Sequence, residues 1–345
     1  MAIGRDSHFS IDGSLSIDRL TLLFFTPNLS LWNDGSSMVT VNQFSNYIEK
    51  VFLDDLDPDF PQGSPTELFC RHYRTLSGFD IQFGTKMPRR KKIKDSDYIL
   101  LFGTQSDKDQ GFMWQNLPNE YALRVEFNPN KSDSITKLSP LFCDFKNKNQ
   151  ASLVRVARID VAIDYPVEIN PALVLCDCIR KSFIACGKDG LESLYFGTRS
   201  SDNYFRIYNK RIELLENDQI DVGHPLWRVE LESKKSFFLC ENPDLLKSFQ
   251  RLRFFDGCVR SGDWVVDLIL QQASVYGLQT VLRSMPITTQ KRYRKFFKDS
   301  DLSDQLVSPS FIYSRDFLDC WNKLRTQILF SLGFDLVDCI EYGRN

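Results

Sequence analysis

The 345-residue sequence has no apolar run of the roughly 18 to 20 residues that a membrane-spanning helix needs. Its N-terminal segment is polar and lacks the apolar core of a signal peptide. The nine cysteines are scattered and none forms a C-x-x-C pair, so neither a disulfide framework nor a metal clamp is expected. These absences favour a soluble globular protein of the cytoplasm whose cysteines are free thiols.

Four segments alternate an ionic residue with an apolar one, which is typical of a strand with one polar and one buried face. They are residues 124–127, 158–164, 206–210 and 228–232. In the third, Tyr208 lies between Arg206 and Lys210, and strand parity predicts all three side chains on one face. The sequence therefore predicts four strands that carry charge on one side.

The remaining patterns predict an α+β fold. Further strands are expected at residues 16–25, 69–73, 79–83 and 98–102, and a helix at 171–182 after a proline at its start. Apolar spacing of three and four predicts helices at 244–254, 264–276, 278–284, 289–297 and 313–332. We expect a large, mostly antiparallel sheet that carries the site, flanked by helices, with a helical C-terminal region. The predicted domains are residues 1–258 and 259–345.

The formal net charge of −2 argues against nucleic-acid binding only if charge is spread evenly, and here it is clustered. One cluster, in a predicted hairpin, consists of Lys86, Arg89, Arg90, Lys91, Lys92 and Lys94. The other consists of Lys291, Arg292, Arg294, Lys295 and Lys298, with aromatic residues interleaved. Both are candidate phosphate-binding patches. The alternative is a solvated loop for the first and an ordinary helix end for the second.

If the four ionic strands are neighbours, their carboxylates converge. Clustered carboxylates are costly without a cation, and oxygen ligands suit Mg²⁺ or Mn²⁺. Such an ion beside Tyr208 suggests attack of the tyrosine on a phosphodiester, with arginine and lysine stabilising the developing charge. Because a phenol has a pKa of about 10, nearby cations are expected to favour the phenolate. The alternative is a set of cross-strand ion pairs, each worth about 0.2 to 1 kcal/mol.

Five blocks follow one another between about residues 120 and 235. They are R-V-E-F-N-P-N-K at 124–131, R-I-D-V-A-I-D at 158–164, Y-F-G at 195–197 with Arg199, Ser201 and Asp202, R-I-Y-N-K at 206–210, and L-W-R-V-E at 226–230. In this order they resemble the Rep_trans family of rolling-circle replication initiators. The family is typified by Rep proteins of small staphylococcal plasmids and is related to nickases of conjugative elements. Initiators of filamentous vibriophages are of this general kind.

The resemblance implies that Tyr208 nicks one DNA strand at an origin and keeps the 5′ phosphate as a phosphotyrosine, so that the freed 3′ hydroxyl primes synthesis. Arg206 and Lys210 would assist it. The implied metal ligands are Asp160, Glu126 and Glu230 first, and Asp164 second. Residues 1–258 would be the catalytic nickase domain and residues 259–345 the region that recognises the origin duplex. Arg199 and both basic clusters are expected to contact DNA.

The chain also departs from the family pattern. Tyr204 forms Y-x-x-x-Y with Tyr208 and is a candidate second nucleophile, the alternative being a packing role. The basic hairpin at residues 86–94 has no counterpart in the blocks. The three histidines, His8, His72 and His224, form no His-x-His pair, so the histidine-ligated metal site of the other large nickase class is not expected. No G-x-x-x-x-G-K-[ST] loop is present, so a separate helicase must unwind the duplex.

The predicted function is therefore that of a metal-dependent, site-specific DNA nickase and strand transferase that starts rolling-circle replication of a plasmid or phage. The expected location is the cytoplasm of a bacterial host. The expected partners are origin DNA, as duplex and as the single-stranded nick site, with a host helicase and DNA polymerase and no membrane. A homodimer is left open. The alternatives are a relaxase that nicks a transfer origin and a non-catalytic DNA-binding regulator of replication.

Overall fold

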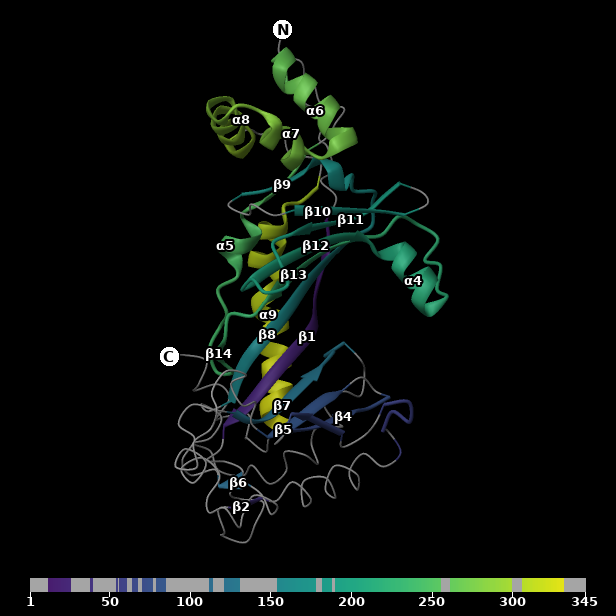
Figure 1. Ribbon diagram of the computed structural model, residues 1–345, viewed down its shortest axis with the longest axis vertical. Coiled ribbons are helices and arrows are strands. Elements are labelled where there is room, and N and C mark those ends of the chain that lie inside the picture. Colours follow the sequence, from purple (N-terminus) through teal and green to yellow (C-terminus); the bar gives the residue numbers. More distant parts are fainter. Residues whose placement is uncertain are drawn as a thin grey trace. The chain divides into compact units, whose positions relative to one another are not determined.

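Figure 1 shows the computed structural model of the chain. It describes residues 12–25, 38–39, 54, 56–60, 64–67, 70–76, 79–84, 112–113, 121–130, 154–177, 182–187, 190–255, 261–299 and 306–331. Within these ranges, no helix combines the length and the apolar character that crossing a membrane requires.

The strands are β1 (Ser14–Phe25), β2 (Met38–Val39), β3 (Ser64–Glu67), β4 (Cys70–Arg74), β5 (Asp80–Gly84), β6 (Phe112–Met113), β7 (Tyr121–Phe127), β8 (Val154–Tyr165), β9 (Val174–Cys176), β10 (Ser182–Gly187), β11 (Gly190–Phe196), β12 (Asn203–Asn209), β13 (Trp227–Ser233), β14 (Phe237–Phe238) and β15 (Leu252–Phe254). The helices are the 3-10 helix η5 (Pro171–Leu173) and the α-helices α4 (Lys210–Asp218), α5 (Leu246–Phe249), α6 (Trp264–Tyr276), α7 (Leu278–Ser284), α8 (Ile287–Asp299) and α9 (Pro309–Ser331).

Eleven strands of the described residues form one sheet. Their order is β10-β11-β12-β13-β8-β1-β7-β5-β4-β3, and β14 pairs with β8. The successive pairs from β10 to β13 are antiparallel, as are β1 with β7, β7 with β5, and β5 with β4. The helices concentrate after residue 260 (Figure 1). The predicted α+β fold, with a large, mostly antiparallel sheet and a helical C-terminal region, is confirmed.

The chain forms two compact units, each made of three segments. Unit 1 consists of residues 1–16, 160–234 and 244–320, and unit 2 of residues 17–159, 235–243 and 321–345. Strands β1 and β8 and helix α9 each contribute residues to both units. The predicted division at residue 258 assigns functions to parts of the chain, and it stays a prediction.

In unit 1, one face of β11, β12 and β13 is apolar. Phe205, Ile207, Val229 and Leu231 are completely buried. Phe249 of α5 packs against this face, with its ring centroid 5.8 Å from that of Phe205. Burial of each such side chain contributes roughly 1.5 to 3 kcal/mol. Because side chains alternate along a strand, this burial directs the ionic residues of the same strands to the opposite face.

A second core in unit 1 joins α6, α7 and α8 to η5 and β9. It includes Leu173, Leu175, Val266, Leu282 and Phe297. The Asp263 side chain caps α6 by accepting a hydrogen bond from the backbone of Val265 at 2.9 Å, and Gly277, with φ 83°, separates α6 from α7. The predicted helices at 264–276 and 278–284 are confirmed. Those predicted at 289–297 and 313–332 correspond to α8 and α9, with somewhat different ends.

Two predicted helices are wrong. The segment 171–182 begins with the single turn of η5, capped by the side chain of Asn170, and then enters the strand β9. The segment 244–254 contains only the short α5 before β15. The two strands pair with each other, and Val174, Leu175 and Leu252 are buried at 2% exposure or less. This pairing joins segments far apart in sequence, so local apolar spacing does not reveal it.

Unit 2 contains the pairing of β7 with β1 and β5. Tyr73, Phe79, Ile81 and Val125 are completely buried in it. The rings of Phe79 and Phe127 lie 5.7 Å apart. The predicted strands at 16–25, 69–73 and 79–83 correspond to β1, β4 and β5. The predicted strand at 98–102 and the basic hairpin at 86–94 lie outside the described residues.

Candidate active site

The candidate site is on the polar face of β11, β12 and β13 in unit 1. Tyr208 of β12 pairs with Arg228 of β13, and Arg206 pairs with Glu230. On the other side of β12, Tyr195 of β11 pairs with Arg206. Paired residues of neighbouring strands point to the same face. The strand parity predicted for Arg206 and Tyr208 is confirmed, and their neighbour β13 supplies the charged residues that face them.

The Tyr208 hydroxyl donates a hydrogen bond to the Glu230 carboxylate. The distance between Tyr208 Oη and Glu230 Oε2 is 3.3 Å, and Tyr208 is half-buried. Burial raises the pKa of the Tyr208 phenol, and the negative charge of Glu230 raises it further. Arg228 and Arg206 act in the opposite direction without offsetting these causes. Neighbouring cations thus act in the expected direction, towards the phenolate, but burial and Glu230 outweigh them, and this arrangement holds the phenol protonated.

Arg206 and Glu230 form an ion pair across β12 and β13. The Glu230 side chain is only 3% exposed, whereas that of Arg206 is 34% exposed. Burial acts to lower the pKa of Arg206, but the charge and hydrogen bond of Glu230 outweigh it, and the pKa is raised. Arg206 Cζ also lies 5.6 Å from the centroid of the Tyr208 ring, within the range of a cation–π contact. We call Tyr208, Arg206 and Glu230 the tyrosine network.

Lys210 does not lie on the strand face, as the sequence suggested. The strand ends at Asn209, whose side chain accepts a hydrogen bond from the backbone of Ile212 at 3.2 Å and caps α4. Lys210 is the first residue of this helix, and its Nζ pairs with Glu213. Because Asn209 caps a helix directly after the strand, the chain changes direction there, and Lys210 lies on the helix and not on the predicted strand face. An assisting role of Lys210 stays a prediction.

Asp164 of β8 binds Arg228 in a bidentate ion pair. Arg228 Nε and Nη2 donate to the two carboxylate oxygens, each at 2.6 Å. This contact and the Arg206–Glu230 pair agree with the alternative left open by the sequence, in which ionic residues of neighbouring strands form ion pairs. The two arginines nearest Tyr208 are thus each neutralised by a carboxylate.

Glu126 lies in unit 2, where other residues bind its carboxylate. Arg19 Nη1 lies 3.3 Å from Glu126 Oε1, and the Thr21 hydroxyl donates to Oε2 at 3.2 Å. Arg124, two residues earlier on the same strand, also binds this carboxylate. Arg124 Nη1 further lies 3.5 Å from an oxygen of Asp80. Glu126 therefore belongs to an ionic cluster of its own unit.

The carboxylates as they stand do not form a metal-binding cluster. Among the described residues, no group of three or more histidine, cysteine, aspartate or glutamate side chains is arranged to hold an ion. Asp160 and Glu230 are both buried, at 1% and 2% exposure. Asp164 is occupied by Arg228. The assignment of these residues and Glu126 as ligands of Mg²⁺ or Mn²⁺ stays a prediction.

Tyr204 also faces the polar side of β12 but is buried, at 8% exposure. Its ring stacks on that of Tyr195, with centroids 6.0 Å apart and an interplanar angle of 15°. Burial raises the pKa of Tyr204, and Tyr195 adds to the shift, whereas the positive charges of Arg199 and Arg206 act to lower it. These contacts agree with the packing role that the sequence left open. Its role as a second nucleophile stays a prediction.

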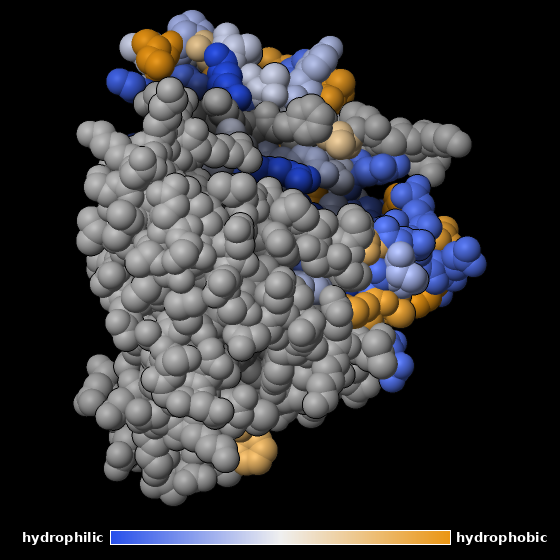
Figure 2. Space-filling view, turned by 60° about the horizontal axis from the view of Figure 1, so that its bottom comes forward, coloured by the Kyte–Doolittle hydropathy of each residue, from blue (hydrophilic) through white to orange (hydrophobic). Residues whose placement is uncertain are grey.

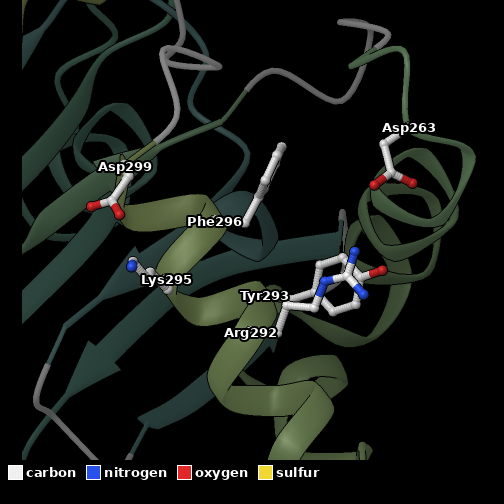
Figure 3. A pocket seen from close by; sticks show the side chains of 6 residues that line it. All are labelled: Asp263, Arg292, Tyr293, Lys295, Phe296 and Asp299. Carbon is white, nitrogen blue, oxygen red and sulfur yellow. The ribbon is translucent and has the colours of Figure 1, made fainter.

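The second basic cluster lies on α8. Lys291, Arg292, Lys295 and Lys298 are exposed, and Arg294 is half-buried. The helix borders a pocket of about 370 Å³ lined by Asp263, Arg292, Tyr293, Lys295, Phe296 and Asp299. In Figure 3, Phe296 extends from α8 between the two aspartates. Figure 2 shows hydrophilic and hydrophobic residues intermixed on the described part of one face. DNA binding by this cluster, by residues 86–94 and by Arg199 stays a prediction.

The sequence did not reveal the contribution of two residues, Arg228 and Tyr195. Both lie within the five blocks, but strand parity gives only the face of a side chain. The cross-strand register then decides that Arg228 meets Tyr208 and that Tyr195 meets Arg206. A pairing signal between residues of different strands is needed to predict such contacts, and one sequence contains none.

Known proteins resemble the part of the chain that carries this site. Residues 176–242 match the model of the Rep_trans family, described as replication initiation factor. The match contains the tyrosine network, Tyr195 and Arg228, whereas Asp164 and Glu126 precede it. The family predicted from the sequence blocks is therefore supported in the segment that contains the tyrosine network.

Curated relatives extend the similarity. A replication initiation protein of Staphylococcus aureus is 30% identical over 227 residues, which cover 63% of this chain and 65% of the relative. A second one from the same organism is 31% identical over 193 residues, covering 54% and 55%. The chain thus spans less than two thirds of the length of these relatives. Together with the match to the family model, they confirm the resemblance to Rep_trans.

One solved structure is also similar, a rolling-circle replication initiator protein from Geobacillus stearothermophilus. It is 14% identical, and the superposition covers 76% of this chain and 97% of that one at a TM-score of 0.36.

Proposed function

We propose that the chain starts rolling-circle replication as a site-specific DNA nickase and strand transferase. The match of residues 176–242 to replication initiation factors supports this, as do the relatives called replication initiation proteins. The observation that carries the proposal is the position of Tyr208. Within the matched segment, its hydroxyl is half-buried, bound to Glu230 and accompanied by Arg206 and Arg228 on one sheet face.

In the proposed reaction, Tyr208 Oη attacks the phosphorus of one phosphodiester bond. The phenolic proton passes to the Glu230 carboxylate, which already accepts its hydrogen bond. The bond from phosphorus to the 3′ oxygen breaks, and this oxygen leaves with the electron pair and takes up a proton. The products are a 5′ phosphotyrosine and a 3′ hydroxyl that primes synthesis. Attack of a 3′ hydroxyl on the phosphotyrosine reverses the step and rejoins a strand.

The charge of the site supports a need for an added cation. Arg206 is paired with Glu230 and Arg228 with Asp164, so the positive charge that each arginine could offer an incoming phosphate is already offset by a carboxylate. A bound Mg²⁺ or Mn²⁺ would supply positive charge to the phosphate oxygens. As they stand, these carboxylates are ion-paired or buried, so the proposed metal requirement rests on the charge of the site and not on a preformed set of ligands.

The same proposal includes the partners. The substrate is origin DNA, duplex around a single-stranded nick site. Because the sequence has no phosphate-binding loop, a host helicase unwinds the duplex and a host polymerase extends the primer. The cytoplasm of a bacterial host supplies both enzymes. A homodimer stays a prediction, which sedimentation of the purified chain would test.

The test is nicking of the supercoiled replicon DNA that encodes the chain, with Mg²⁺ or Mn²⁺ present. We expect the wild-type protein to convert it to open circles and Tyr208→Phe to produce none, because the attacking oxygen is gone. Mass spectrometry of the trapped peptide should locate the phosphotyrosine at Tyr208. Tyr276→Phe is the matched control, since Tyr276 is 62% exposed on α6 and should nick like the wild type.

Other outcomes would favour the alternatives. Nicking that survives in Tyr208→Phe would move the nucleophile to Tyr204 or elsewhere. Nicking only of DNA that carries a transfer origin would identify a relaxase. DNA binding without cleavage by the wild-type protein, with either metal ion, would identify a regulator.

A further inference from the structure

A second tyrosine, Tyr195, lies one diagonal position from Tyr208 on the neighbouring strand. Tyr195 pairs with Arg206, so it is the diagonal neighbour of both Tyr204 and Tyr208, two residues to either side along β12. Diagonal neighbours in an antiparallel pair are about 7 to 8 Å apart, within reach of aromatic side chains. The Tyr195 ring is therefore within reach of a ligand bound at the Tyr208 hydroxyl.

The Tyr195 ring is supported from one side and partly accessible. It is half-buried, whereas Tyr204, on which it stacks nearly parallel, is 8% exposed. The burial of Tyr204 and its stacking contact with Tyr195 define the supporting side of this ring. The pair is thus a flat aromatic surface whose inner ring is fixed and whose outer ring is Tyr195.

The loop that carries Arg199 is itself held in one conformation. Gly197 has φ 94°, and a Cβ added there would lie 3.1 Å from the carbonyl oxygen of Asn203, so only glycine fits without strain. The Thr198 hydroxyl is 2.9 Å from that of Ser201, and Lys234 Nζ donates to the backbone carbonyl of Arg199. The exposed Arg199 side chain is thereby placed as a cation beside the aromatic pair.

From this arrangement we infer that Tyr195, supported by Tyr204, stacks on one base of single-stranded DNA directly beside the scissile phosphate. The inference rests on the proposed function and names a contact that positions the substrate. A half-exposed ring, one diagonal position from the residue that carries the attacking hydroxyl and near a cation, matches what single-stranded DNA presents, a flat base followed by a phosphate. A paired duplex does not fit, because its bases are stacked on each other. Such stacking tolerates every base. Tyr195 therefore contributes to the affinity for the DNA strand and to its position in the site more than to the choice of sequence.

Binding of oligonucleotides tests the inference without cleavage. In the Tyr208→Phe background, fluorescence anisotropy gives the Kd of a single strand that spans the nick site, and of strands with one abasic nucleotide at successive positions. Tyr195→Leu should weaken binding of the intact strand about tenfold, the order expected for one base stacked on one ring. Tyr195→Phe should bind like the parent, because the ring remains.

The decisive result is the double change. At one position beside the nick, an abasic nucleotide and Tyr195→Leu should together weaken binding no more than either alone, because they remove the same contact. At distant positions, the fold-increase in Kd caused by the abasic nucleotide and the one caused by Tyr195→Leu should multiply. Multiplication at every position, or full affinity in Tyr195→Leu, would overturn the inference. Tyr276→Leu is the matched control and should leave every Kd unchanged.

A second measurement covers the case in which Tyr195→Leu fails to fold. With the native Tyr195 and a 2-aminopurine placed at successive positions, fluorescence should be quenched on binding at one position beside the nick. Uniform quenching, or none, would overturn the inference. These outcomes are distinct from failure of the proposed function. A wild-type protein that nicks but shows no coupling refutes only the stacking contact, whereas a protein that neither nicks nor binds the strand refutes both.

Discussion

The same tripeptide, arginine-valine-glutamate, occurs in both units and meets different partners. In unit 2, Arg124 binds Glu126 of its own strand, and the glutamate also accepts a hydrogen bond from the Thr21 hydroxyl at 3.2 Å. The Glu126 side chain is 16% exposed. Within this unit the tripeptide is part of a partly exposed ionic cluster, and the hydroxyl bound to its glutamate is the aliphatic one of Thr21.

In unit 1, the tripeptide at 228–230 is divided between two contacts. Arg228 binds Asp164 of β8, and Glu230 binds Arg206 of β12 and accepts a hydrogen bond from the Tyr208 hydroxyl at 3.3 Å. Here the glutamate is 3% exposed and its hydroxyl partner is a phenol. The difference shows that the tripeptide specifies a strand and a polar face, while the neighbouring strand decides whether that face carries a potential nucleophile.

The largest expected difference between the two units is the effect of removing each glutamate. Glu230→Ala leaves the partly exposed Arg206 without its nearly buried carboxylate partner, and we expect it to cost about 3 kcal/mol of local stability, the lower end of the loss for a broken buried ion pair. Glu126→Ala removes a more exposed carboxylate and should cost about 1 kcal/mol. Hydrogen exchange at neutral pH, resolved to peptides of β12–β13 and of β7, measures the two losses separately. Equal losses of local stability in the two variants would show that the difference in burial between Glu230 and Glu126 does not affect how much each carboxylate stabilises its unit.

The next prediction concerns alkaline pH and involves unit 1. The pKa of Tyr208 is raised above its ordinary value of 10.0, so its contribution to stability is present below pH 10 and is lost as the pH rises above that value, where the unfolded chain ionises first. Wild-type stability should fall more steeply than that of Tyr208→Phe, by up to about 1.4 kcal/mol per pH unit. Urea unfolding from pH 8 to 11 provides the comparison. Parallel curves for the two proteins would contradict the protonated phenol.

The comparison also explains which features a sequence reveals. Helices α6 and α7 were predicted with correct ends from apolar spacing alone, and the structure shows that local signals mark these ends, since Asp263 caps α6 and Gly277 separates the two helices. The position of Tyr208 on a polar strand face follows from alternation alone. By contrast, Lys210 was misplaced because the cap of Asn209 turns the chain into α4 directly after the strand. Local spacing does not report such a cap when the strand pattern continues through it.

Contacts between strands were the part that sequence could not supply. The pairing of β9 with β15 replaced two predicted helices, because buried apolar runs suit a strand as well as a helix. That the carboxylates converge on a metal ion stays a prediction, whereas the arginine partners that register gives Glu230 and Asp164 were not predicted as contacts. Parity predicts the face of each ionic residue, and only the register decides whether a carboxylate meets a cation, a hydroxyl or another carboxylate.

The smallest expected effect is an acid response in unit 2. Burial acts to raise the pKa of Asp80, but His72, whose Nε2 lies 2.9 Å from Asp80 Oδ2, and then Arg124 and Arg74 outweigh it, so the pKa is lowered below 3.8. This carboxylate therefore stabilises the fold above pH 3.8, and its contribution is lost as the pH falls through the lower folded value. Asp80→Asn should remove about 1 kcal/mol at pH 6 and less below pH 3.8. Calorimetric unfolding from pH 6 to 3 measures the difference, and Tyr208→Phe should follow the wild type over this range because its phenol stays protonated. A pH-independent difference in stability between Asp80→Asn and the wild type would show that Asp80 acts through packing and not through its charge. The contrast between an ionised carboxylate in unit 2 and a protonated phenol in unit 1 would then be lost.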